Sequence, residues 1–232
     1  ANVRGDLPEG LPARRIDASA NIQGEALTID ATLEEVAAGP TRADALVIRA
    51  TGTPNDADFI VEMDGNTELD GLSYRTTFSV DGNVQGLTAG APDLTASIDG
   101  ALGEVELSTR EPLRFQSYED GMEISADLAA LGGGLSTTLT TRGDTQIRVN
   151  ADGLEIAPLL ILVGRPALDG ALELSIAFDE TAEGGLSGPI NAEMRGISRA
   201  GSDIAPVDLF VTGDLTPSLL DLAIRALDNE TL

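Results

Sequence analysis

Apolar and polar side chains alternate at every second residue along this chain, and this pattern strongly limits how it can fold. In the clearest stretch the alternate residues are apolar, aromatic or threonine: Leu72, Tyr74, Thr76, Phe78 and Val80. The residues between them, from Ser73 to Asp81, are all polar or charged. Successive side chains of a β-strand point to opposite faces, so the pattern predicts strands that are apolar on one face only.

The same period of two recurs between Ile16 and Val211 and predicts about a dozen strands. Glycine beside aspartate is typical of tight turns, and such pairs occur at 64, 70, 81, 99, 120, 143, 152, 169 and 213. Short turns join antiparallel neighbours, whereas parallel pairing needs long crossovers, and the sequence contains no helical crossover pattern. An all-β antiparallel meander is therefore expected.

A sheet of this size has to shield its apolar side. It can pack against a second sheet in a filled core, close into a barrel, or curl into an open trough, and alternation alone leaves these alternatives open. A barrel of the outer-membrane type has girdles of aromatic residues. This chain has five Phe, two Tyr and no Trp, which argues against such a barrel.

The set of reactive side chains is small. There is no Cys or His, and all 14 basic residues are Arg, so Lys is absent as well. Ser-His and Cys-His nucleophiles, thiolate redox sites, ordinary zinc sites, Schiff bases and P-loop lysines are thereby excluded. The expectation is a protein that is not an enzyme and has no cofactor and no metal.

Neighbouring carboxylates occur as Asp56 with Asp58 and as Glu34 with Glu35. They could bind calcium or form an acid-base pair, but neither has the spacing of a calcium-binding loop. Solvated surface charge is the preferred interpretation.

The formal net charge is −25. Such a charge repels phosphate backbones and anionic headgroups, so nucleic-acid binding and polybasic membrane docking are not expected. The longest apolar run, from Ile156 to Gly164, is far shorter than the roughly 20 residues that span a bilayer.

Two segments depart from the alternation. Thr216 and Pro217 suit an N-cap and a first helical turn, and apolar residues follow at helical spacing, which predicts an amphipathic helix over residues 216–230. The run from Pro158 to Gly164 fits a short helix or a buried strand, and periodicity does not distinguish them.

A series of short motifs is similar to a known family. The motifs are rich in Gly, Pro and Leu and occur in the order Pro112–Phe115, Gly121–Ile124, Leu131–Leu135, Leu154–Leu160, Pro166–Leu172 and Gly185–Ile190. Their order resembles the middle of the TamB family, inner-membrane-anchored subunits of the translocation and assembly module within the wider AsmA-like group.

This resemblance implies a β-taco, a long U-shaped sheet with a hydrophobic groove, standing in the periplasm of a Gram-negative bacterium. Residues 1–232 would be a single β-taco segment of a longer protein that is anchored in the inner membrane. Such proteins are thought to carry phospholipids between the two membranes. The alternative is a chaperone-like module for outer-membrane proteins and autotransporters. It acts with a β-barrel partner, which would be contacted by parts outside this segment.

The candidate site is the apolar face, with acyl chains along it and headgroups in solvent. The residues expected to line this lipid groove are Leu27, Ile29, Phe59, Val61, Leu72, Phe78, Leu94, Ile98, Leu107, Phe115, Ile124, Leu139, Val149, Leu174, Ile176 and Phe178. The assembly alternative instead predicts free sheet edges near Ile16–Ile29 or Val207–Val211, where client strands could pair. A structural spacer with a filled interior is a third possibility.

Overall fold

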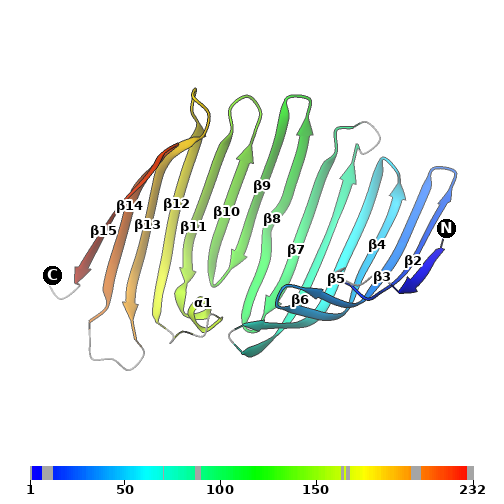
Figure 1. Cartoon of the computed structure of the whole chain (residues 1–232), viewed down its shortest axis with the longest axis horizontal. Helices are drawn as coiled ribbons and strands as arrows, with labels where there is room; N and C mark the ends of the chain where they lie inside the picture. The colour runs from blue at the N-terminus through cyan, green and yellow to red at the C-terminus, as the bar shows by residue number, and fades with distance from the viewer. Residues whose placement is uncertain are drawn as a thin grey trace. The chain divides into compact units, whose positions relative to one another are not determined.

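The computed structural model describes residues 2–6, 13–69, 71–86, 90–162, 165, 168–199 and 205–228. Its strands form one antiparallel sheet of 15 strands that follow one another in chain order, from β1 at one edge to β15 at the other (Figure 1). The predicted all-β antiparallel meander is thus confirmed, and the sheet is not closed.

The chain divides into two compact units, Ala1–Ser117 and Tyr118–Leu232. The strands that begin in the first unit are β1 (Asn2–Asp6), β2 (Arg15–Gln23), β3 (Ala26–Ala38), β4 (Thr41–Thr53), β5 (Asp56–Leu69), β6 (Leu72–Gln85), β7 (Asp93–Leu102) and β8 (Val105–Tyr118). The second unit contains β9 (Gly121–Ala130), β10 (Gly133–Thr140), β11 (Gln146–Glu155), α1 (Ile156–Leu162), β12 (Asp169–Glu180), β13 (Leu186–Ser198), β14 (Val207–Thr216) and β15 (Leu219–Asp228).

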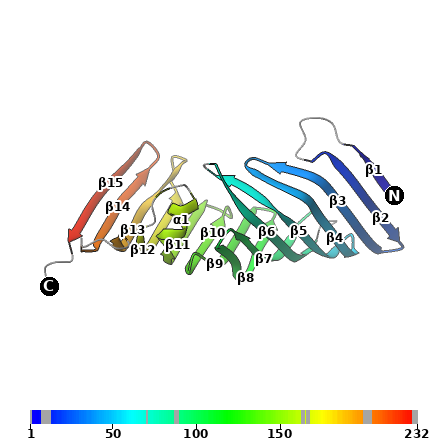
Figure 2. The ribbon, with the colours of Figure 1, turned by 90° about the horizontal axis from the view of Figure 1, so that it is seen from below.

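The strands of each unit lie in one layer in Figure 2. The ambiguous run that begins at Pro158 lies in the helix α1, up to Leu162, while Val163 and Gly164 lie outside the described residues. The backbone N–H of Glu155 donates to the carbonyl of Leu131 at 2.7 Å, which ties the start of α1 to the turn between β9 and β10.

The helix predicted over residues 216–230 is wrong. Residues 219–228 form β15, which pairs with β14 in an unbroken antiparallel register from Thr216 opposite Leu219 to Val207 opposite Asp228. The Thr216 hydroxyl accepts a hydrogen bond from the Leu219 N–H at 3.1 Å, across the two-residue turn of Pro217 and Ser218. Residues 229 and 230 lie outside the described part.

Both periodicities are present in this segment, which explains the error. Leu220, Leu222 and Ile224 are apolar residues at a spacing of two. Apolar residues in the same segment also recur at spacings of three and four, which is the helical pattern. A strand here satisfies the backbone groups of β14 that would otherwise lie unpaired at the edge. That hydrogen-bond partner is non-local, so local periodicity does not reveal it.

Several glycine–aspartate pairs that were expected to form turns lie inside strands instead. Gly65, Gly82 and Gly100 lie inside β5, β6 and β7, and the pairs at 152, 169 and 213 are likewise in strands. The pairs at 120 and 143 do lie at turns, as does Gly71, whereas Asp70 is outside the described residues.

Close approach of neighbouring strands accounts for two of these glycines. A Cβ on Gly65 would collide with the carbonyl oxygen of Arg42 and lie 2.8 Å from the Cα of Ala43. A Cβ on Gly82 would collide with the carbonyl of Thr95 and lie 2.8 Å from the Phe59 ring. Glycine is required at these two positions because the neighbouring strand leaves no room for a Cβ, and not because the chain turns there.

Little of the sheet is deeply buried. The buried hydrophobic residues are few, and most of them are alanines: Ala13, Val36, Ala43, Ala57, Ala96, Ala151 and Leu154. Among the described residues no large side chain is fully buried. The described chain therefore does not contain the two tightly meshed layers of a filled sandwich core.

Candidate functional site

The strand register of unit 1 collects the predicted residues on one face. Directly opposed residues of antiparallel strands share a face. Val61 lies opposite Val80, and Met63 lies opposite Phe78. The predicted residues that share this face, here called the apolar face of unit 1, are Leu27, Ile29, Phe59, Val61, Leu72, Phe78, Leu94, Ile98, Leu107 and Phe115.

Unit 2 has an equivalent surface, here called the apolar face of unit 2. Ile124 lies opposite Leu139, and Val149 lies opposite Ile176. The predicted residues that share this face are Ile124, Leu139, Val149, Leu174, Ile176 and Phe178. Every residue predicted for the groove thus lies on the apolar face of its own unit.

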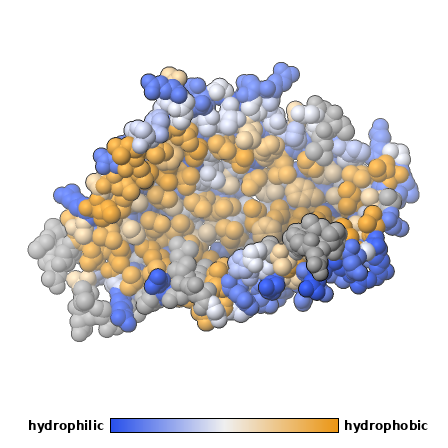
Figure 3. Space-filling view, in the orientation of Figure 1, coloured by the Kyte–Doolittle hydropathy of each residue, from blue (hydrophilic) through white to orange (hydrophobic). Residues whose placement is uncertain are grey.

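These faces carry almost no charge. Across β2 to β7, the described residues on the apolar face of unit 1 are aliphatic residues, Met, Phe, Gly, Thr and Tyr, without an Asp, Glu or Arg. The direct partners of the predicted residues of unit 2 are likewise uncharged. In Figure 3 orange dominates the surface over β10 to β14, and it also covers much of the surface over β4 to β7.

The apolar side chains are shielded mainly by their neighbours in the sheet, with further contacts from Ala13 in unit 1 and from α1 against β12 in unit 2. Leu72 is 52% exposed, and the other predicted residues are half-buried. Val3, Ile22 and Ile224, which share these faces, are 58%, 62% and 73% exposed. The described strands form a single sheet, and no second sheet of described residues covers either face.

A line of irregularities crosses the strands of unit 1. Glu35 in β3 has a φ of 52°, the register of β4 against β5 shifts between Ala43 and Ala45, and Gly65 follows in β5. Beyond this line lies a small buried cluster of Ala13, Val36 and Ala43. Bulges of this kind bend strands, and in Figure 1 the ends of β3 to β6 turn aside here.

Three hydroxyls form a polar row on this bent part of the apolar face. The Oγ1 atom of Thr67 is 2.8 Å from that of Thr41 and 2.7 Å from that of Thr76. The Thr76 hydroxyl also donates to the carbonyl of Tyr74 at 3.4 Å. Thr67 is only 6% exposed, so the row satisfies hydroxyls that would otherwise be buried without partners.

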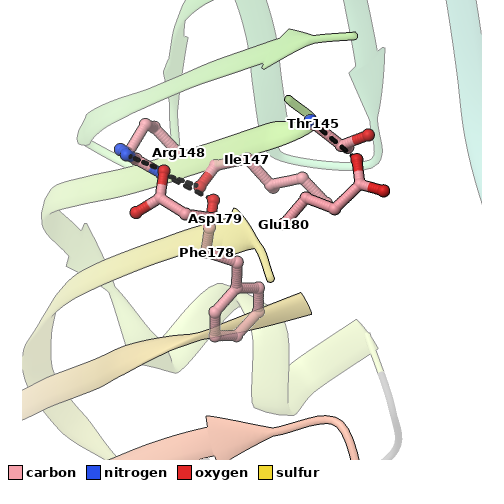
Figure 4. Close-up of polar contacts among 6 residues, drawn as sticks. All are labelled: Thr145, Ile147, Arg148, Phe178, Asp179 and Glu180. Carbon is pink, nitrogen blue, oxygen red and sulfur yellow. Dashed lines mark hydrogen bonds and ion pairs between the residues drawn. The ribbon is translucent and has the colours of Figure 1, made fainter. Parts of the chain in front are cut away.

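The face of the sheet opposite the apolar one carries ion pairs and hydrogen bonds between charged side chains. Arg148 donates to Asp179 and to the carbonyl of Phe178, both at 2.6 Å, while the Phe178 ring points away from these contacts (Figure 4). Hydrogen bonding to the side chain of Thr145, and then to its N–H at 2.9 Å, lowers the pKa of the Glu180 carboxyl. The two faces of one strand therefore have different chemistry.

The paired carboxylates found in the sequence lie among such contacts. Asp56 and Asp58 both accept hydrogen bonds from the side-chain amide of Asn83, each at 2.9 Å. Glu34 and Glu35 lie 3.6 and 3.5 Å from guanidinium nitrogens of Arg15 and Arg14 respectively. Within the described ranges, no group of three or more His, Cys, Asp or Glu side chains is arranged to hold a metal ion.

A hollow of about 640 Å³ lies on the polar side of β4 to β6. Its walls include the charged residues Arg42, Asp44, Glu62 and Asp64, and atoms of apolar residues such as Val47 and Phe78. The charged residues of this recess face away from the predicted groove, and its lining as a whole is a mixture of polar and apolar atoms.

The Arg75–Asp64 pair provides a pH test of the polar face. The nitrogen–oxygen distance is 2.7 Å, and the hydrogen bond from Arg75 lowers the pKa of the Asp64 carboxyl. We expect Arg75→Gln to return this pKa toward the ordinary aspartate value, as measured by carboxyl NMR titration. A lowered folded-state pKa means that the pair stabilises the fold above the ordinary pKa, and that this contribution is lost as pH falls through the lowered value.

The matched control is Arg49→Gln, because Arg49 pairs with Glu62 at 3.1 Å on the same face. It should leave the Asp64 titration unchanged. An Asp64 pKa that is the same in wild type and Arg75→Gln would show that the pair does not set it.

Several members of the apolar faces were not among the residues predicted to line the groove. They include Leu33, Leu46, Ile48, Met63, Val80, Leu209 and Val211. In β4 the run Ala45–Ile48 is apolar throughout, so the alternation is hidden there. The signal that could have identified Leu46 and Ile48 is the register against β3 and β5, which needs the paired strands.

The described part of the chain contains no helix with the length and hydrophobicity needed to cross a bilayer. Comparison with known proteins identifies no relative, because no family model, no curated protein and no solved structure matches the chain.

Proposed function

We propose that this chain is a segment of a bridge-like lipid transport protein that conducts phospholipid acyl chains along its apolar faces. The observation that carries the proposal is the apolar face of each unit, which carries almost no charge, is half-exposed and is not covered by a second sheet of described residues. Headgroups would remain in solvent while the tails lie against the sheet. A spacer with a filled interior would need a second apolar layer, and the described residues do not supply one.

The energetics favour a hydrocarbon guest. Removing apolar surface from water stabilises a complex by about 0.8 kcal/mol for each buried methylene. The described walls are mostly aliphatic, so an acyl tail gains a similar free energy at successive positions along the face. Movement along such a face is passive.

The cellular setting is proposed from the TamB-like order of motifs. The chain would stand in the periplasm as part of a protein anchored in the inner membrane, with an outer-membrane β-barrel partner contacted by other parts. The proposal includes a β-taco form, in which the sheet curls around its apolar side. The bulges and close-packed glycines of β3 to β6 support curling, because they bend strands.

The second candidate is a module that assembles outer-membrane proteins by pairing its free edges with client strands. The edge expected near Val207–Val211 is wrong, because β14 is paired on both sides, and near Ile16–Ile29 the strand β3 is likewise paired on both sides, while β2 pairs with β1 over Arg15–Ser19. The free edges of the described sheet are β1 and β15. Under this candidate, polypeptide would be captured at these two strands.

Photo-crosslinking in cells tests the lipid proposal. A photoreactive residue at Phe78 or at Ile124, on the two apolar faces, is expected to yield phospholipid adducts detected by mass spectrometry. Ser79 is the control, because it follows Phe78 in β6 and points to the opposite face. Equal recovery from Phe78 and Ser79, or no lipid at either apolar position, would contradict the proposal.

A further inference from the structure

β15 carries large, exposed apolar side chains on both of its faces. Leu220, Leu222 and Ile224 share the apolar face of unit 2 through their partners in β14. On the opposite side β15 carries Leu219 and Leu227. Their exposed fractions are 62% for Leu219, 49% for Leu220, 48% for Leu222, 73% for Ile224 and 43% for Leu227. Strands that are apolar on both faces are typical of the covered interior of a sheet.

The outer edge of β15 has no partner strand in the described chain. Among the described strands it is the outermost one, at the red end of Figure 1. Every second residue of such an edge strand directs its backbone N–H and C=O away from the sheet, where another strand can pair with them.

The two charges in the middle of β15 are poorly matched by β14. Asp221 lies directly opposite Asp214, and Arg225 lies opposite Phe210. Neither Asp221 nor Arg225 forms an ion pair with any residue that the structure describes. Like charges directly across a sheet destabilise it, so a cation beside Asp221 would be favourable.

The sequence of β15 is complementary to itself when reversed about Ala223. In an antiparallel pairing of two copies centred there, Leu222 meets Ile224 and Leu220 meets Ala226, all on the apolar face. On the other face Leu219 meets Leu227, and Asp221 meets Arg225 twice, once in each direction.

We propose that two copies of this chain join edge to edge through β15, antiparallel and centred on Ala223. The contact is isologous, because each copy presents the same strand to the other, and it closes after two copies. The twofold relation keeps the apolar sides of the two joined β15 strands on the same side of the sheet. It also places the guanidinium of Arg225 beside the Asp214–Asp221 carboxylate pair.

Charge variants of the 232-residue chain test this arrangement by sedimentation equilibrium or light scattering over a concentration series. Wild type is expected to dimerise. In the proposed dimer, position 221 of each copy lies opposite position 225 of the other. Arg225→Asp and Asp221→Arg each place like charges at both of these contacts, and each should raise the dissociation constant of the dimer about tenfold or more. The double variant D221R/R225D exchanges the two charges at each of these contacts, so opposite charges face each other again and the dimer should be restored.

A mixture gives the sharpest result. The Asp221→Arg copy is basic at both positions and the Arg225→Asp copy is acidic at both, so the two should form a heterodimer when mixed. Arg49→Asp in β4 is the control for net charge, and it should leave the dimer unchanged.

A monomeric wild type at concentrations of about 100 μM would overturn the proposal, since an edge that binds so weakly would not pair at ordinary protein levels. A dimer that tolerates both single variants would also overturn it, because the contact would then lie elsewhere. Failure of D221R/R225D to recover, although it is folded by circular dichroism, would exclude the register centred on Ala223.

Discussion

The Val61→Asp variant is expected to bind acyl chains about a hundredfold more weakly than wild type, whereas Ile60→Asp should bind them normally. Val61 lies between Ile48 and Val80 in the middle of the apolar face of unit 1. A carboxylate at this position would lose its hydration under a bound tail and would find no cation on the face. Burying an unpaired charge costs several kcal/mol, and each 1.4 kcal/mol corresponds to about tenfold in affinity.

Ile60→Asp is a closely matched control. Ile60 is the neighbour of Val61 in β5, points to the polar face between Arg49 and Asp81, and is 39% exposed. Both variants replace a β-branched residue and add one negative charge. Binding can be measured by titrating a fluorescent fatty acid, with circular dichroism to establish folding. An equal loss of binding in both variants would mean that charge in general, and not the apolar face, governs binding.

The Gly65→Val variant is expected to destabilise the protein by about 3 kcal/mol or more. A Cβ at this position would collide with the Arg42 carbonyl oxygen and lie 2.9 Å from the Cβ of Ala43. The obstacle includes the backbone of β4, which cannot rotate away as a side chain can. The measurement is chemical denaturation followed by circular dichroism.

Gly5→Val in β1 is the control, because a Cβ there would have no heavy atom within 4 Å. Its effect should be within about 0.5 kcal/mol. If Gly65→Val were as stable as Gly5→Val, the close approach of β4 and β5 would not limit the residue at position 65.

The amphipathic pattern of the strands could be predicted from the amino-acid order. Residues such as Val61, Phe78 and Ile176 were assigned to one face by period two alone, and the structure places them on the apolar faces. This succeeds because side-chain direction in a strand depends only on local backbone geometry. The absence of His, Cys and Lys likewise limits the available chemistry before any fold is known.

Pairing between strands decided the rest. Residues 219–228 fit a helix and a strand equally well, and the open edge of β14 selected the strand through backbone hydrogen bonds. Gly65 and Gly82 have the local signature of turns, but the closeness of the neighbouring strands places them within the sheet. Leu46 and Ile48 were found only through the register with β3 and β5. Alternation is a local property that the sequence determines, whereas strand ends, register and the uncovered apolar surface depend on contacts between distant residues.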